Sequence, residues 1–160
     1  MQNEKILSDR HIEEIEKIVE SNYGTKIDLK KYGVIINEIN QKMKIFSKKI
    51  LNLELKRLRL DSIGIYFGKI KSNNKIHLTI EGSQMVGKTA TLNVATLSEK
   101  SSEEFMRGKE VVPESASGCQ DHNFVIIKSR EDILGSSLFE NGKIKNLLPR
   151  SRRIIMSNIL

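Results

Sequence analysis

The sequence predicts an α+β protein with a small mixed α/β domain over residues 1–85 and a β-rich domain, built as a small barrel, over residues 86–160. Three observations predict this arrangement. A helical repeat near the N-terminus is followed by apolar strand-like runs. After residue 81 the pattern changes to short β segments separated by turn residues. Finally, 160 residues suffice for one ordinary domain or two small ones.

The first half begins with a helix over residues 9–23. Asp9 is the expected N-cap and Gly24 the expected stop. The apolar residues at helical spacing are Ile12, Ile15, Val19 and Tyr23. Together these signals predict an amphipathic helix.

Strands are predicted from runs of β-branched and aromatic residues, and the first two suggest a hairpin. The expected strands are residues 32–39, 43–47, 63–67 and 76–80, with turns at residues 40–41 and 72–74. Residues 50–60 fit both a strand and one face of a helix, and we favour a short helix there.

The second half contains shorter elements. Ser101 to Glu104 resembles a capping box that opens a brief helix, which Gly108 closes. The Asn141-Gly142 pair is the strongest hairpin signal in the chain. Strands are expected over residues 93–97, 110–112 and 124–127, and the short segments 133–134 and 137–139 flank Gly135. Several short strands with one helix are typical of a small β-barrel.

The chain is basic, with a net charge of +7, which favours polyanionic partners. Residues 1–80 carry 16 basic and 10 acidic side chains, and residues 81–160 carry 11 and 10. Residues 42–59 contain seven basic side chains and one acidic side chain, Glu54. Such a run is usually a solvated surface, although it can also contact a polyanion.

Cysteine and histidine give no strong signal for catalysis or metal binding. Cys119 is the only cysteine, which excludes an intramolecular disulfide and suits a reducing cytosol. Neither a signal peptide nor the ~18 apolar residues of a membrane span is recognisable, so we expect a cytoplasmic protein that does not contact membranes. His11, His77 and His122 are scattered. We therefore assign no catalytic residue, no metal ligand and no cofactor.

One motif suggests a nucleotide. Gly82 to Thr89 matches the phosphate-binding loop pattern G-x-x-x-x-G-K-[ST], and an expected strand precedes it. The residues after Thr89 are β-branched and form helices poorly, whereas the loop must open a helix. A small nucleotide-binding enzyme is thus an alternative, and a turn between the domains is the favoured interpretation.

The basic C-terminal segment suggests RNA more strongly. Arginine's planar guanidinium suits phosphate oxygens, and Arg150, Arg152 and Arg153 lie close together around a proline and a serine. Aromatic residues are not interleaved there, which favours recognition of the backbone of structured RNA over stacking on bases.

Several segments resemble the accessory region of the Nop/Sun/Fmu family of rRNA cytosine-C5 methyltransferases and its short archaeal stand-alone relatives. They are IGIYFGKI (63–70), LTIEGSQ (78–84), FMRG (105–108), FVIIK (124–128), ILG (133–135) and NLLPRSRRI (146–154). The resemblance implies that the C-terminal part is a PUA-like pseudobarrel, an RNA-binding module, in a ribosome-biogenesis protein. Its RNA-facing surface would comprise residues 101–107, 109–118 and a final strand over 150–154.

The chain also departs from that family. PUA domains often have Gly-Asp where this chain has Asp121-His122-Asn123, and Cys119 follows a glycine where the catalytic cysteine of the methyltransferases follows a proline. A glycine-rich G-x-G-x-x-G cofactor loop is also absent from the sequence. We therefore do not carry methylation over to this chain.

The sequence thus predicts a non-enzymatic RNA-binding protein in rRNA maturation, whose partners are rRNA or a pre-ribosomal particle and a ribosome-biogenesis protein. Arg107 and Lys109 would position phosphate at the helix end, while the last strand would clamp the RNA backbone. The predicted RNA-binding residues are Arg107, Lys109, Lys143, Lys145, Arg150, Arg152 and Arg153. A protein-interaction module for a separate RNA-modifying enzyme is a further alternative.

Overall fold

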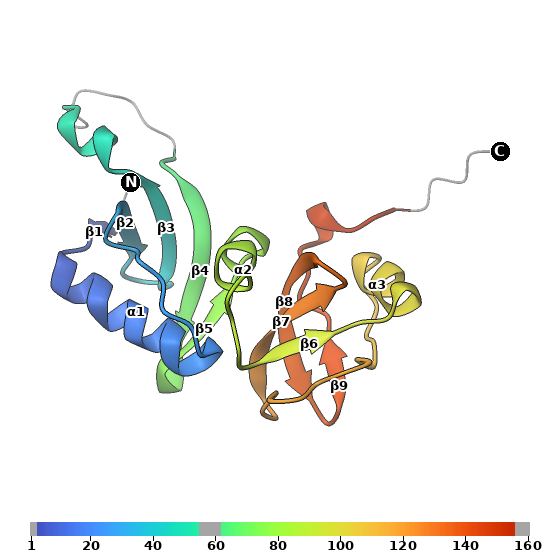
Figure 1. The fold of residues 1–160 in the computed structure, drawn as a ribbon. Coiled ribbons are helices and arrows are strands. Elements are labelled where there is room, and N and C mark those ends of the chain that lie inside the picture. The colour runs from blue at the N-terminus through green and yellow to red at the C-terminus, as the bar shows by residue number, and fades with distance from the viewer. Residues whose placement is uncertain (1–2, 55–61, 156–160) are drawn as a thin grey trace.

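The computed structural model describes residues 3–54 and 62–155, which form two β-sheets with a short helix between them (Figure 1). The first sheet has five antiparallel strands in the order β1-β2-β3-β4-β5. Its strands are β1 (Glu4–Ile6), β2 (Tyr32–Asn37), β3 (Lys42–Ser47), β4 (Ile65–Lys71) and β5 (Lys75–Leu78). The predicted hairpin of residues 32–47 is therefore confirmed.

Helix α1 (Asp9–Tyr23) covers one face of this sheet, as Figure 1 shows. Its four predicted apolar residues are all buried, so the predicted amphipathic helix is confirmed. The N-cap is Ser8 and not Asp9. At the other end Gly24 adopts a left-handed φ of 64°, and its N–H donates to the carbonyl of Glu20.

Two short 3₁₀ turns interrupt the strands. The first, η1 (Lys48–Asn52), follows β3, so a short helical turn is found where the predicted helix begins. The rest of that prediction lies partly at residues 55–61, outside the described residues. The second, η3 (Ser72–Asn74), makes the predicted turn between β4 and β5.

Helix α2 (Ile80–Val86) overturns the phosphate-binding loop hypothesis. Strand β5 ends at Leu78, two residues earlier than predicted, and the Thr79 hydroxyl caps the helix by accepting from the N–H of Gly82 at 3.0 Å. Gly82 therefore lies inside a helix that ends where the helix of a nucleotide site would begin. The nucleotide-binding interpretation of Gly82 to Thr89 is wrong, and the turn favoured for these residues is found only at residues 87–89.

Gly82 has a packing role instead. A Cβ atom at this position would lie 2.1 Å from the carbonyl oxygen of Phe67, so only glycine lets α2 approach β4 this closely. The motif's first glycine thus belongs to the contact between a helix and a strand.

The second sheet has four strands in the order β6-β7-β8-β9, with β6 parallel to β7 and the other pairs antiparallel. The predicted turn at Asn141-Gly142 joins β8 to β9. The elements are β6 (Val94–Thr96), α3 (Glu99–Met106), β7 (Asn123–Ser129), β8 (Asp132–Glu140), β9 (Lys143–Lys145) and the 3₁₀ turn η4 (Arg150–Arg152).

Two details of the second half differ from the predictions. Helix α3 begins at Glu99, because Ser98 caps it by accepting from the N–H of Ser101. The strand expected over residues 110–112 is reduced to a single bridge between Val111 and Ile144.

Each sheet has its own apolar core, and the two cores meet around α2. The core under α1 also includes Val86 of α2 and Ile126 of β7. In addition, the His77 ring of β5 stacks on the Phe124 ring of β7, with centroids 4.7 Å apart. The two sheets are therefore packed against each other, and a domain boundary at residue 85 stays a prediction.

The helices within the described residues are too short or too polar to cross a lipid bilayer.

Candidate nucleic-acid interface

The C-terminal end of α3 is fastened to the last described segment of the chain. The Asn146 side-chain amide donates to the carbonyls of Phe105 and Lys109, both at 2.8 Å. The N–H of Ile154 donates to the carbonyl of Met106 at 2.8 Å. These bonds satisfy carbonyls that a helix leaves unpaired at its end. They bring residues 107–109 beside residues 150–154.

Arg153 lies directly on this junction. Its Nε donates to the carbonyl of Leu148 at 3.0 Å, and its aliphatic part covers Gly108. A Cβ at Gly108, whose φ is 91°, would lie 2.6 Å from Arg153 Cδ. Arg153 is thereby held between the helix end and the chain's last segment.

The expected final strand over residues 150–154 is wrong in its secondary structure. Residues Arg150–Arg152 form η4, in which the N–H of Arg152 donates to the carbonyl of Pro149. A 3₁₀ turn fans its side chains outward in different directions. Arg150 and Arg152 are consequently exposed without the fixed alternation of a strand.

Arg152 is paired with a residue that the sequence did not single out. Its Nη1 lies 2.7 Å from the carboxylate of Glu81 on α2. Partial burial by itself would raise the pKa of Glu81, but the hydrogen bond and charge of Arg152 outweigh burial and hold the pKa below its ordinary value. Arg152 is therefore partly neutralised.

Lys143 and Lys145 lie on β9, on either side of the buried Ile144. Lys143 lies 3.7 Å from the Glu110 carboxylate, and Lys145 lies 3.8 Å from the Glu140 carboxylate. Such exposed pairs contribute little to stability. They do offset the local positive charge that these two lysines were expected to supply.

Five of the seven predicted residues therefore lie on the two segments that these bonds join, which together we name the arginine end: Arg107, Lys109, Arg150, Arg152 and Arg153. Among the described residues, no carboxylate pairs with Arg107, Lys109 or Arg150. Lys143 and Lys145 differ from this group in that each lies beside a carboxylate, Glu110 and Glu140 respectively. Sequence reasoning missed Asn146, whose bonds assemble the arginine end, and Glu81.

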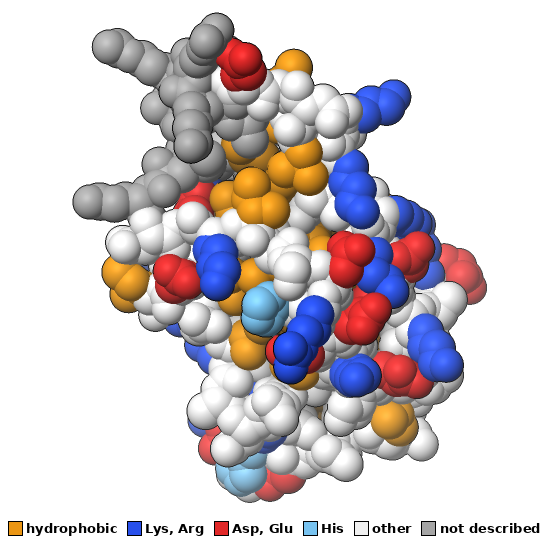
Figure 2. All heavy atoms as spheres, turned by 90° about the vertical axis from the view of Figure 1, so that its left-hand side faces the viewer, with side chains coloured by type: hydrophobic (Ala, Val, Ile, Leu, Met, Phe, Trp, Pro, Cys, Tyr) orange, Lys and Arg blue, Asp and Glu red, His pale blue; other side chains and the backbone are white. Residues whose placement is uncertain are grey.

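The surroundings of the arginine end are acidic. Residues 99–118, which cover α3 and the loop after it, contain three basic and five acidic side chains. Mixed charge also covers the side of the molecule where α1 lies (Figure 2). The arginine end is thus a local concentration of positive charge, and α3 adds no net positive charge to it.

The remaining chemical candidates give no reactive site. Burial raises the pKa of the Cys119 thiol to about 11, so the thiol is protonated near neutral pH. His122 Nε2 lies 3.3 Å from the Asp121 carboxylate on the exposed loop nearby. In the part of the chain that the structure describes, no three metal-ligating side chains converge.

Comparison with known proteins gives a family match in the second half of the chain. Residues 92–154 match the family model described as the methyltransferase RsmF PUA domain. The chain is also similar to the ribosomal RNA small subunit methyltransferase F of Aeromonas salmonicida (strain A449), with 32% identity over 94 residues. That alignment covers 59% of this chain and 19% of the methyltransferase, so the chain spans about a fifth of its relative's length.

Two solved structures share the fold. A conserved PUA domain protein from Thermoplasma acidophilum superposes with a TM-score of 0.57 at 10% identity, covering 86% of this chain and 81% of that one. A hypothetical protein from Pyrococcus horikoshii OT3 gives a TM-score of 0.52 at 14% identity, covering 86% and 83%. The predicted α+β fold and the predicted family resemblance are confirmed. Residues 92–154 are a PUA-like region of the kind found in the Nop/Sun/Fmu rRNA methyltransferases.

Proposed function

We propose that this chain is a non-enzymatic RNA-binding protein that acts on rRNA or a pre-ribosomal particle in the cytoplasm. The observation that carries the proposal is the match of residues 92–154 to the PUA domain of an rRNA methyltransferase. PUA domains are RNA-binding modules. The chain matches 19% of that enzyme's length, so the proposal takes over only the role of the matching module.

The arginine end is the surface that we propose for RNA contact. Its arginine forks suit phosphate oxygens, and four of its five cations have no carboxylate partner among the described residues, the exception being Arg152. Asn146 and Arg153 hold the two segments together before any ligand binds. A preassembled group of cations loses less side-chain freedom on binding than separate flexible ones.

The test is the salt dependence of RNA binding, measured by fluorescence anisotropy on a short rRNA hairpin. Each phosphate contact contributes roughly 0.7 to 0.9 to the slope of log affinity against log salt. The triple variant Arg107→Ala, Lys109→Ala, Arg150→Ala should bind at least about tenfold more weakly and lose about 2 to 3 from the slope.

A charge-matched control removes three exposed cations on the side of α1: Arg10→Ala, Lys17→Ala and Lys26→Ala. Because both triple variants change net charge equally, a difference between them reports position and not charge alone. Equal weakening by the two variants would contradict RNA contact at the arginine end. A wild-type protein that binds no RNA would remove the proposed function altogether.

A further inference from the structure

A second group of cations lies on the first sheet, on the face opposite α1. Lys42 on β3 is directly opposite Lys69 on β4, and Lys71 on β4 is directly opposite Lys75 on β5. Side chains directly opposite each other lie on the same face, as do residues two apart in one strand. These four residues, which we name the lysine face, are therefore neighbours across three strands.

The register of the lysine face is electrostatically unfavourable. Like charges directly opposite each other destabilise an antiparallel pair, and here two such pairs are adjacent. Within residues 3–54 and 62–155, no carboxylate lies at ion-pair distance from any of the four lysines. Burial lowers the pKa of Lys71, and the nearby charge of Lys69 lowers it further. The Lys75 ammonium donates to the His122 carbonyl at 3.0 Å, which leaves Lys42, Lys69 and Lys71 as the members whose charge a bound anion would compensate.

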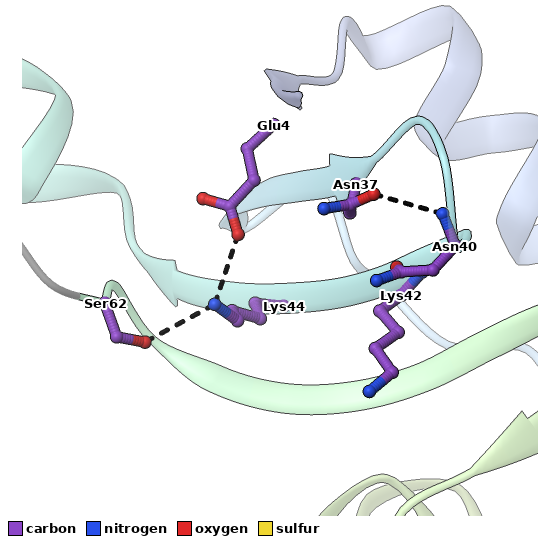
Figure 3. A network of polar contacts seen from close by, with 6 residues as sticks. All are labelled: Glu4, Asn37, Asn40, Lys42, Lys44 and Ser62. Atoms are coloured by element: carbon purple, nitrogen blue, oxygen red, sulfur yellow. Dashed lines mark hydrogen bonds and ion pairs between the residues drawn. The ribbon is translucent and has the colours of Figure 1, made fainter. Parts of the chain in front are cut away.

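Lys44, on the same strand as Lys42, provides an internal contrast. Figure 3 shows its ammonium held by Glu4 at 3.2 Å and by the Ser62 hydroxyl at 3.4 Å. Lys42 instead extends over β4, as Figure 3 shows. Its ammonium lies 5.5 Å from the centre of the Tyr66 ring. The fold therefore neutralises one lysine of β3 and leaves the other available to a ligand.

A groove joins the lysine face to the arginine end. It has a volume of about 320 Å³, and both Lys69 and Arg152 line it. Tyr66 and His77 contribute from the first sheet, and Leu147 and Pro149 from the C-terminal segment. Glu81, which pairs with Arg152, also lines the groove, so Lys69 is its unpaired cation among the described residues. Apolar and aromatic walls beside one unpaired cation suit a nucleotide, whose base is flat and whose phosphate is charged. The volume lies in the range of small-molecule sites.

From the paired lysines and this groove, we infer that the lysine face is a second RNA-contacting surface, so that one RNA strand crosses from the first sheet to the arginine end. The inference rests on the proposed function. Phosphates of an unpaired strand would lie over Lys42, Lys69 and Lys71, with a nucleotide in the groove. RNA is favoured over an acidic membrane because the cations border a groove with an aromatic wall and do not surround an exposed apolar patch.

The experiment measures binding of a hairpin RNA with a single-stranded tail, and of the same hairpin without the tail, by fluorescence anisotropy at several salt concentrations. The variant Lys42→Ala, Lys69→Ala, Lys71→Ala should bind the tailed RNA at least about tenfold more weakly, with a slope smaller by about 2. The Lys→Arg version should keep wild-type affinity within about threefold, since it retains every charge. The control is Arg10→Ala, Lys17→Ala, Lys26→Ala.

Thermal unfolding of the triple alanine variant shows whether weaker RNA binding comes from lost RNA contacts or from a less stable protein. Because the alanine variant removes opposed like charges, its Tm at low salt should equal or exceed that of the wild type. Wild-type affinity in this variant, together with weak binding by the arginine-end variant, would overturn the inference and keep the proposed function. Absence of RNA binding by the wild type would overturn both. Binding to phosphatidylserine vesicles that needs the lysine face, without RNA binding, would also overturn the inference.

Discussion

The arginine end and the lysine face are both basic, but they manage their charge differently. Arg152 is paired with Glu81, and Arg153 donates to the Leu148 carbonyl. The lysine face instead places Lys42 opposite Lys69 with no carboxylate at hand among the described residues. The arginine end consists of cations partly held by the protein, whereas the lysine face keeps repelling cations side by side. The second arrangement needs a ligand more, even though the first is the more conspicuous in the sequence.

The largest expected effect comes from the contact that holds these two regions together. A Cβ in Gly82→Ala would meet the Phe67 carbonyl, so α2 must move away from β4. We expect the free energy of unfolding to fall by about 3 kcal/mol, because overpacking against backbone is relieved only by moving the helix. Denaturant titration measures this change.

Gln84→Ala on the exposed side of α2 is the matched control, and it should change stability by less than about 0.5 kcal/mol. If Gly82→Ala were as stable as this control, α2 would not be the close contact between helix and sheet that fixes the groove. RNA affinity of a folded Gly82→Ala variant, measured at low temperature, would then show how far the two cationic regions depend on their spacing.

The wrong prediction at Gly82 also shows which features of the fold cannot be predicted from local sequence patterns. The helix over residues 9–23 was predictable, because Ile12, Ile15 and Val19 report burial by their spacing alone. The role of Gly82 depends on Phe67, a strand residue whose approach no local pattern encodes. A letter-for-letter motif match was therefore misleading, since the same glycine can serve a loop or a close contact.

The candidate site likewise has features that were predictable from the sequence and features that were not. Arginines close together in sequence were predictable as a group, and the C-terminal segment does present them together. The Arg152–Glu81 pair joins residues 71 positions apart, and the lysine face arises only when β3, β4 and β5 pair in a particular register. Charge runs along the chain are readable from sequence, whereas charge across strands depends on register.

The next largest expected effect is a pH-dependent loss of stability at His77, which lies beside the lysine face. Burial lowers its pKa to about 4, and the charges of Lys71 and Lys69 on β4 contribute to the shift. From β7 and β8, it faces Phe124 and the Ser136 backbone, neither of which titrates. Its unfolded pKa is about 6.5, so the unfolded chain binds the proton more readily.

The stability contribution of His77 is therefore complete above about pH 6.5 and is lost as the pH falls toward about 4. We expect a loss on the order of 1 to 2 kcal/mol, allowing for partial exposure. The free energy of unfolding of the wild type and of His77→Phe, compared between about pH 6.5 and about pH 4, isolates the contribution of His77. NMR titration should show the imidazole pKa rising when RNA neutralises Lys69 and Lys71. An unchanged pKa in the RNA complex would place the RNA away from these lysines.

The smallest expected effect is a gain in RNA affinity, and it tests Glu81, which lies between the arginine end and the lysine face. Glu81→Gln removes a negative charge from the groove and releases Arg152, so RNA affinity should rise by about two- to threefold. The control Glu13→Gln makes the same charge change on α1, where it releases Lys30 from a 3.0 Å pair. Anisotropy at constant salt should separate the two variants. A gain of equal size in both would assign the effect to net charge, whereas a gain confined to Glu81→Gln would place RNA in the groove, where the two cationic regions meet.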